Sequence, residues 1–155
     1  SIAMKLSTKG RYALVSLVDI AKHQHQGLVS IAEVSRRQDI SLAYLEQLFS
    51  KIRRNDLVVS TRGHGGGYKL ARGASAISIE EILLAVDENI DARSTGAGMK
   101  GGACGSIEQV LSNKMWESLS AQVHLYLHRT TLADVIDDSL SPCPAMPSLS
   151  EFEET

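Results

Sequence analysis

The sequence predicts a mainly helical fold in which a short β-hairpin follows three helices and a long helix lies nearer the C-terminus. Apolar residues recur at helical spacing in several segments, and each segment follows a residue that can cap a helix. Residues 57–62 and 68–71 are short and β-prone, and they flank a glycine-rich stretch, which is typical of two antiparallel strands. Residues 106–129 keep the helical pattern far longer than any other segment.

The first three helices are expected between residue 7 and residue 54. Ser7 or Thr8 can cap the first. Ser30 stands three residues before Glu33, which is the spacing of a capping box and predicts a short second helix. Ser41 caps the third helix after a three-residue break, and its apolar side chains recur at i, i+3, i+4 and i+7: Leu45, Leu48, Phe49 and Ile52. Two short helices joined in this way form a helix-turn-helix.

The glycine-rich stretch "TRGHGGGYKL" is predicted to be the tip of the hairpin, so that the whole is a winged helix-turn-helix. A phosphate-binding loop is not expected, because no Gly-Lys-Ser/Thr follows and no helix begins there. Glycines at a wing tip let backbone N–H groups come close to phosphates, and Gly66 is a candidate for such a contact. Arg62 is placed to enter a minor groove, and His64 is expected to be a neutral hydrogen-bonding residue of the tip.

The outer face of the third helix carries small and polar side chains toward its N-terminal half and cations toward its C-terminal half. Its members are Ala43, Glu46, Gln47, Ser50 and Arg54, flanked by Tyr44, Lys51 and Arg53. A recognition helix in a DNA major groove needs this division. An ordinary amphipathic helix with a solvated face is the alternative.

Charge is distributed unevenly along the chain. Residues 1–72 hold 12 of the 16 Lys and Arg residues but only 5 of the 18 Asp and Glu residues, a formal charge of +7, and residues 73–155 carry −9. A basic first half suggests an anionic partner, with nucleic acid the first choice, although a merely lopsided solvated surface gives the same numbers.

The second half is expected to begin with a core helix capped by Ser78 and Glu81, followed by a glycine-rich stretch that reaches residue 105. Ser106 and Gln109 then cap the long helix. Its wide apolar surface suits either a partner subunit or the protein core: Val110, Leu111, Met115, Trp116, Leu119, Val123, Tyr126 and Leu127. A last short helix precedes an acidic, proline-containing tail.

The expected regions are a DNA-binding winged helix (4–73), a helix with a sensor loop (78–105), a dimerisation helix with a short helix (106–138) and the tail (139–155). No apolar run approaches the length of a membrane span and no secretory pattern opens the chain, so we expect a cytoplasmic protein. Cys104 and Cys143 form no disulfide framework.

Four stretches resemble bacterial small winged-helix transcription regulators of the IscR (iron–sulfur cluster regulator) type. They are "MKLSTKGRYAL" from Met4, "ISLAYLEQLFSKIRRNDLV" from Ile40, "RGHGGGYKLAR" from Arg62 and "ILLAVDENIDA" from Ile82. Trp116 and "TLADVI" match the later part, so the resemblance covers about residues 4–138.

The resemblance implies a homodimer, paired through the helix at 106–130, that binds double-stranded operator DNA and represses iron–sulfur, iron or redox-linked genes. Ala43, Glu46 and Gln47 would face bases, and Arg62 would enter the minor groove. Candidates for phosphate contacts are Lys9, Arg11, Ser41, Tyr44, Lys51 and Arg54. Phosphates repel the carboxylate of Glu46 unless it accepts a hydrogen bond from cytosine, so it can act as a selectivity filter.

Members of this type bind a [2Fe–2S] cluster through three cysteines and a histidine, and only Cys104 of that set is present. Val110 and Asn113 stand at the positions of the last cysteine and the histidine, and Ser94 or Thr95 stands near the first cysteine. Because valine cannot ligate iron, and hydroxyl and amide groups replace a thiolate poorly, ordinary ligation is excluded.

Three interpretations of the sensor stay open. An atypical [2Fe–2S] cluster could be held by Cys104 with His124, His128, carboxylates, Cys143 or groups of the other subunit. Cys104 could instead be a redox-responsive thiol, favoured as thiolate beside a helix N-terminus. The loop could also be a remnant, with a small ligand or a protein partner as the regulator.

Two other function classes are weighed against a DNA-binding regulator. A winged helix used only for protein interaction conflicts with the basic first half and with the polar face of the third helix. An enzyme built on Cys104 with His124 or His128 lacks a His-Glu-x-x-His pattern and an oxyanion hole, so no enzyme is expected.

Overall fold

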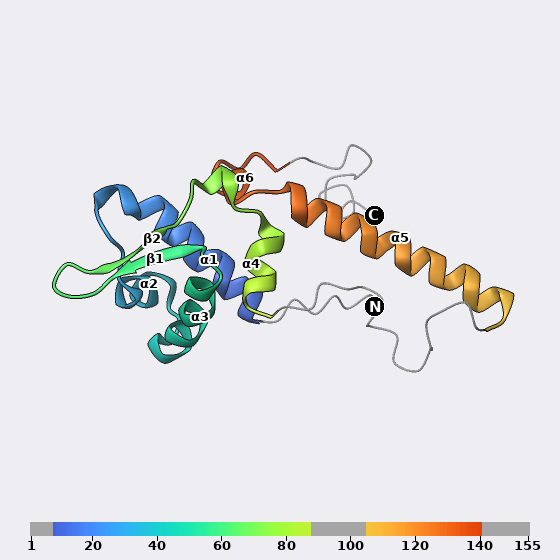
Figure 1. Ribbon diagram of the computed structural model, residues 1–155, viewed down its shortest axis with the longest axis horizontal. Coiled ribbons are helices and arrows are strands. Elements are labelled where there is room, and N and C mark those ends of the chain that lie inside the picture. The colour runs from blue at the N-terminus through green and yellow to red at the C-terminus, as the bar shows by residue number, and fades with distance from the viewer. Residues whose placement is uncertain (1–7, 88–104, 141–155) are drawn as a thin grey trace, which may run out of the picture.

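The computed structural model describes residues 8–87 and 105–140, and its elements follow the predicted order (Figure 1). The helices are α1 (Thr8–His23), α2 (Ile31–Gln38), α3 (Leu42–Arg54), α4 (Ile79–Ala85), α5 (Ile107–Arg129) and α6 (Leu132–Ile136), with 3-10 turns η1 (Gln24–Gln26) and η2 (Ala74–Ala76). The strands are β1 (Val58–Thr61) and β2 (Gly67–Leu70). The predicted fold class, mainly α with a two-stranded wing and a long C-terminal helix, is confirmed.

The helix starts follow from the capping residues. Ser30 and Glu33 form a reciprocal capping box: the Ser30 N–H donates to Glu33 Oε2 at 2.7 Å, and the Glu33 N–H donates to Ser30 Oγ at 3.1 Å. The boxes predicted at Ser78 and Ser106 are also formed. Ser7, one of the two predicted caps of the first helix, lies outside the described residues.

One core joins α1, α3, α4, α6 and the start of the hairpin. Its fully buried large side chains include Leu17 and Ile20 of α1, Leu45, Phe49 and Ile52 of α3, Ile82 of α4 and Leu132 of α6. Full burial of each such side chain contributes about 1.5–3 kcal/mol. The inner face of α3 is therefore fixed to the body, and its other face is left to solvent.

The hairpin is a regular antiparallel pair in which Val58 lies opposite Leu70 and Thr61 lies opposite Gly67. Val29 extends it, because its N–H donates to Tyr68 O at 2.9 Å and its carbonyl accepts the Tyr68 N–H at 2.7 Å. A Cβ on Gly67 would lie 2.7 Å from the Val29 oxygen, so glycine is required where these backbones meet.

The long helix α5 extends away from this body, at the opposite end from the hairpin (Figure 1). It is anchored through Thr130, whose carbonyl accepts the Ile79 N–H at 2.9 Å, and through Leu132, whose N–H donates to Ile77 O at 2.9 Å. Of the apolar residues predicted on it, Leu111, Met115 and Tyr126 are exposed, so the alternative that assigned the whole set to the core is wrong for these three. Within residues 8–87 and 105–140, no helix combines the length and apolarity that crossing a membrane requires.

Candidate nucleic-acid interface

The outer face of α3 carries the side chains that the sequence placed there. Leu45, Leu48, Phe49 and Ile52 are buried, while Ala43, Glu46, Gln47, Ser50 and Arg54 are exposed. The alternation follows the 3.6-residue repeat, so these five residues occupy one continuous strip. A major groove admits a helix of this kind, and the strip offers it a methyl group, a carboxylate, an amide and a hydroxyl.

The N-terminal end of α3 is held by Ser41 and Tyr44. Ser41 Oγ accepts the Tyr44 N–H at 3.4 Å and caps the helix, which leaves the Ser41 hydroxyl hydrogen able to donate to an external acceptor. The Tyr44 ring meets the Tyr12 ring of α1 edge to face, with centroids 5.6 Å apart. Tyr44 thus lies near the first turns of α1.

Two of the predicted phosphate contacts sit at the beginning of α1. Arg11 is exposed and Lys9 is half-buried, and both lie in the first turn after Thr8. α1 contacts α3, and Lys9 lies close enough to Asp87, the partner of Lys51, for their charges to interact.

The three cations at the C-terminal end of α3 differ in the groups that they contact. Lys51 Nζ lies 2.7 Å from Asp87 Oδ2, an ion pair that the sequence did not indicate. Arg54 stays on the exposed face, with its Nε donating to the Ser50 carbonyl at 3.3 Å. Arg53 Nη1 donates to Ser60 Oγ at 3.5 Å, so it faces β1 and connects α3 to the wing.

The wing tip is largely exposed and turns tightly. Arg62 and His64 are exposed, and Gly63 and Gly65 have positive φ angles of 106° and 76°. The hairpin projects from the end of the molecule where α2 and α3 lie (Figure 1). The first strand of the hairpin contacts α3, while the tip itself extends past α2 in the view of Figure 1.

Gly66 has an internal role that the sequence analysis missed. Its N–H donates to the Gly63 carbonyl at 2.9 Å, and a Cβ there would lie 2.3 Å from the Thr61 oxygen. The expected phosphate contact through this amide is therefore corrected: the amide closes the turn of the wing itself.

An ion pair between a buried carboxylate and a partly exposed arginine fixes α2 against α1. The Asp19 side chain is 0% exposed, and Arg37 donates to it twice, at 2.6 Å and 3.0 Å, while Gln38 Nε2 donates at 2.7 Å. Burial raises the pKa of Asp19, but hydrogen bonds from Arg37 and Gln38, together with nearby positive charge, outweigh it and hold this pKa below its ordinary value. A carboxylate within "SLVDIAKH" was the sequence signal for such a partner, because buried charges are paired.

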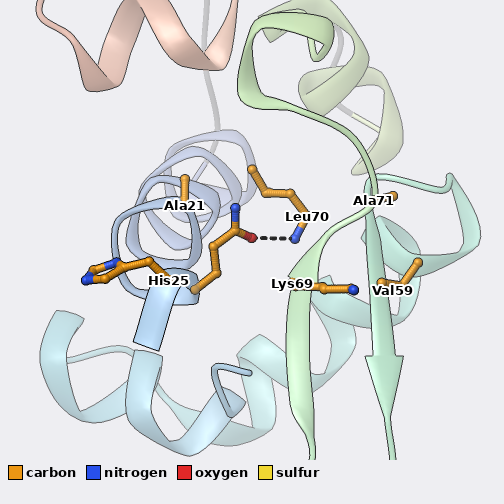
Figure 2. A pocket seen from close by; sticks show the side chains of 7 residues that line it. Ala21, His25, Val59, Lys69, Leu70 and Ala71 are labelled. Atoms are coloured by element: carbon orange, nitrogen blue, oxygen red, sulfur yellow. Dashed lines mark hydrogen bonds between the residues drawn. The ribbon is translucent and has the colours of Figure 1, made fainter. Parts of the chain in front are cut away.

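A shallow cavity borders the wing and is lined by both polar and apolar side chains. It measures about 640 Å³ and lies between η1, the end of α1 and the hairpin. Gln24 Oε1 accepts the Leu70 N–H at 2.9 Å there, and Figure 2 shows the His25 ring pointing away from Lys69. The side chains of His25 and Lys69 therefore do not converge on one point of this cavity (Figure 2).

The expected sensor falls largely outside the described residues, and this includes Cys104, Cys143, Ser94 and Thr95. In residues 8–87 and 105–140, no three His, Cys, Asp or Glu side chains form a group that could hold a metal. Val110 and Asn113 are half-buried on α5, and His128 Nδ1 lies 3.5 Å from Glu80 Oε2. The residues present do not fit a cluster held by three cysteines and a histidine, because valine has no ligand atom.

Comparisons with known proteins agree with this architecture. Residues 6–138 match the profile of the Rrf2 family, described as iron-dependent transcriptional regulator. An HTH-type transcriptional regulator IscR of Cereibacter sphaeroides is 60% identical over 148 residues, which cover 94% of this chain and 96% of that protein. The IscR of Erwinia tasmaniensis is 44% identical, covering 87% of this chain and 80% of that protein.

Two solved structures have the same fold. CymR (YrzC), the global cysteine regulator of B. subtilis, superposes with a TM-score of 0.74 at 30% identity, covering 87% of this chain and 98% of that one. IscR of T. potens superposes with a TM-score of 0.63 at 30% identity, covering 97% of each chain. With a winged helix, an exposed recognition face and a family match over most of its length, the chain belongs to the Rrf2 family of transcriptional regulators.

Proposed function

We propose that the protein is a homodimeric, sequence-specific DNA-binding repressor of iron–sulfur, iron or redox-linked genes. The observation that carries the proposal is the polar strip on α3: five exposed side chains on a helix whose other face is fully buried. Such a helix is rigid enough to present base-reading groups at fixed spacing. The IscR name of its relatives supports the iron–sulfur assignment.

In this proposal, α3 reads the major groove. Gln47 can donate to and accept from one adenine, and the Ala43 methyl group can contact a thymine methyl. Glu46 accepts from a cytosine amino group and is repelled by phosphates wherever no such donor is present. Glu46 therefore raises selectivity more than affinity.

Around that helix, cations and hydroxyls bind the backbone. Arg62 on the wing enters the adjacent minor groove, where the negative potential favours a guanidinium. Lys9, Arg11, Lys51 and Arg54 are the cationic partners of phosphates in this proposal, and Ser41 and Tyr44 add hydroxyl donors. His64, at the tip of the wing, adds a hydrogen bond to the DNA.

The α5 helix is the proposed dimer contact. Five of its apolar side chains are 40–63% exposed: Ile107, Leu111, Met115, Leu125 and Tyr126. At 3.6 residues per turn they fall within about 100° of the helix circumference, on the side away from its buried residue Ser120. A monomer seldom leaves an apolar stripe of this length in water, and a second α5 fits it by symmetry.

Regulation is proposed to enter through Cys104. The chain has two cysteines, so one chain cannot supply the thiolates of an ordinary cluster. Cys104 is then either the thiolate of a [2Fe–2S] cluster completed by other donor types or by the partner subunit, or a thiol that responds to redox state by itself. Anaerobic purification with iron and sulfide analysis of the wild type and of Cys104→Ala tests this, because iron retained equally in both removes Cys104 as a ligand.

The DNA-binding proposal is tested by selecting duplexes from a randomised pool at low salt, in the reduced and in the oxidised protein. We expect one sequence class to be retained, with an affinity that Arg62→Ala lowers at least tenfold, an effect of about 1.4 kcal/mol or more. Arg129→Ala, which removes an exposed arginine from the end of α5, is the matched control and should leave affinity unchanged. Retention of no duplex in either redox state would refute the proposal.

A further inference from the structure

The ion pair between Lys51 and Asp87 lies at the surface that the proposed function assigns to DNA. Lys51 Nζ is 2.7 Å from Asp87 Oδ2, and the two side chains are 36% and 70% exposed. The pair is therefore open to solvent, and a DNA phosphate could reach the lysine. An exposed ion pair of this kind contributes little to stability, so a competing anion can displace the carboxylate from the lysine.

The backbone keeps this carboxylate close to α3. Asp87 follows the C-cap of α4 in the left-handed conformation, with φ of 61°, and its N–H donates to the Leu84 carbonyl at 3.2 Å. Asn55 bridges the two helix ends, because its Nδ2 lies 2.8 Å from the Lys51 carbonyl and 3.5 Å from that of Ala85. The end of α4 is thus fastened to the end of α3.

Asp87 also interacts with two further cations of the proposed interface. The hydrogen bond and charge of Lys51, with smaller effects of Lys9 and Arg54, hold the pKa of Asp87 below its ordinary value, so the carboxylate is ionised at neutral pH. Three of the six proposed phosphate contacts therefore share one negative charge. A carboxylate oxygen and a phosphate oxygen are equivalent acceptors for an ammonium group.

We infer that Asp87 competes with the DNA backbone for Lys51. In the DNA-free protein the Asp87 carboxylate is paired with Lys51, and this pairing lowers the affinity of the protein for duplex DNA. This inference rests on the proposed function and adds a residue that opposes binding. DNA must displace the carboxylate from Lys51, and the displaced charge then repels nearby phosphates. Asp87 thereby sets the affinity without touching a base.

The alternative is that Asp87 positions Lys51 for a phosphate, and Asp87→Asn distinguishes the two. Asparagine tolerates the left-handed conformation, so the substitution removes charge and keeps the end of α4. Competition predicts that Asp87→Asn binds the selected duplex about 3- to 10-fold more tightly at about 0.1 M salt. The slope of log affinity against log salt should steepen by up to about one unit, because the contact between Lys51 and a phosphate is no longer offset by the negative charge of Asp87.

Two further variants make the test specific. In a Lys51→Ala background the gain from Asp87→Asn should fall below about twofold, because Lys51 is the main partner. Asp138→Asn is the matched control. Asp138 is exposed, has φ of 52° and follows α6 in the chain, and Figure 1 shows α6 apart from α3, so the loss of this charge should not change affinity.

The inference would be overturned if Asp87→Asn bound the duplex more weakly than the wild type or equally well. It would also be overturned if Asp87→Asn raised the affinity as much in the Lys51→Ala background as in the wild type. Failure of the wild type itself to bind any duplex would instead overturn the proposed function, and the inference with it.

Discussion

Arg37→Ala is predicted to destabilise the fold strongly, because it leaves a buried carboxylate without its charge partner. Asp19 is 0% exposed at its side chain and receives two hydrogen bonds from Arg37, of 2.6 Å and 3.0 Å. Breaking a buried pair costs about 3–5 kcal/mol when the stranded group has no other partner. Gln38 keeps its 2.7 Å hydrogen bond to Asp19, so we expect a loss of about 2–4 kcal/mol.

The pH dependence gives this prediction a second signature. The folded-state pKa of Asp19 lies below its unfolded value, so its stabilising contribution is present above the unfolded pKa and is lost as the pH falls through the folded pKa. Arg37→Ala removes the largest of the effects that lower this pKa, so we expect the folded pKa of Asp19 to rise. The difference between variant and wild type should therefore be largest near neutral pH and shrink toward about pH 4.

Urea denaturation at fixed protein concentration measures this difference, with Arg36→Ala as the control. Arg36 is the exposed neighbour on α2, and its removal should change the free energy of unfolding by about 0.5 kcal/mol or less. If Arg37→Ala costs no more than this control, or if its cost is the same at every pH, the pair does not fix α2 as argued.

Three other substitutions test the interface, the wing and the dimer. Gly66→Ala should displace the wing tip and weaken DNA binding, since its Cβ would lie 2.3 Å from the Thr61 oxygen, whereas Gly73→Ala, with only Ser75 Oγ near at 3.9 Å, should have no effect. Glu46→Ala should relax discrimination at one base pair by about 1–3 kcal/mol, seen as a broader set of duplexes from a randomised pool; an unchanged set would count against its role. Leu111→Lys should yield monomers in sedimentation experiments, and a dimer that persists would exclude this stripe as the contact.

Features encoded within a few residues could be predicted from the sequence. The capping pairs at Ser30, Ser78 and Ser106 were identified from spacing alone, because a serine and an acid or amide three residues later bond to each other's backbone. The exposed face of α3 was predicted for the same reason, since helical periodicity determines which side is buried.

Contacts between distant residues could not be predicted. Lys51 and Asp87 are 36 positions apart, and Asp19 and Arg37 are 18 apart, so only the packed helices bring them together. The internal role of Gly66 depends on the path of the hairpin backbone, which composition does not specify. The sequence predicts a wide apolar surface on α5, but only the fold shows which side of it is exposed and which is packed.

The most direct test of the account is the salt dependence of duplex binding by the wild type and by a Gln47→Ala, Arg62→Ala double variant. If α3 and the wing hold DNA, the wild-type affinity for its selected duplex falls steeply between about 50 and 200 mM salt. The double variant should then lose its preference for that duplex over unrelated DNA. An affinity insensitive to salt, or a preference that survives both substitutions, would contradict the assignment of this surface to DNA.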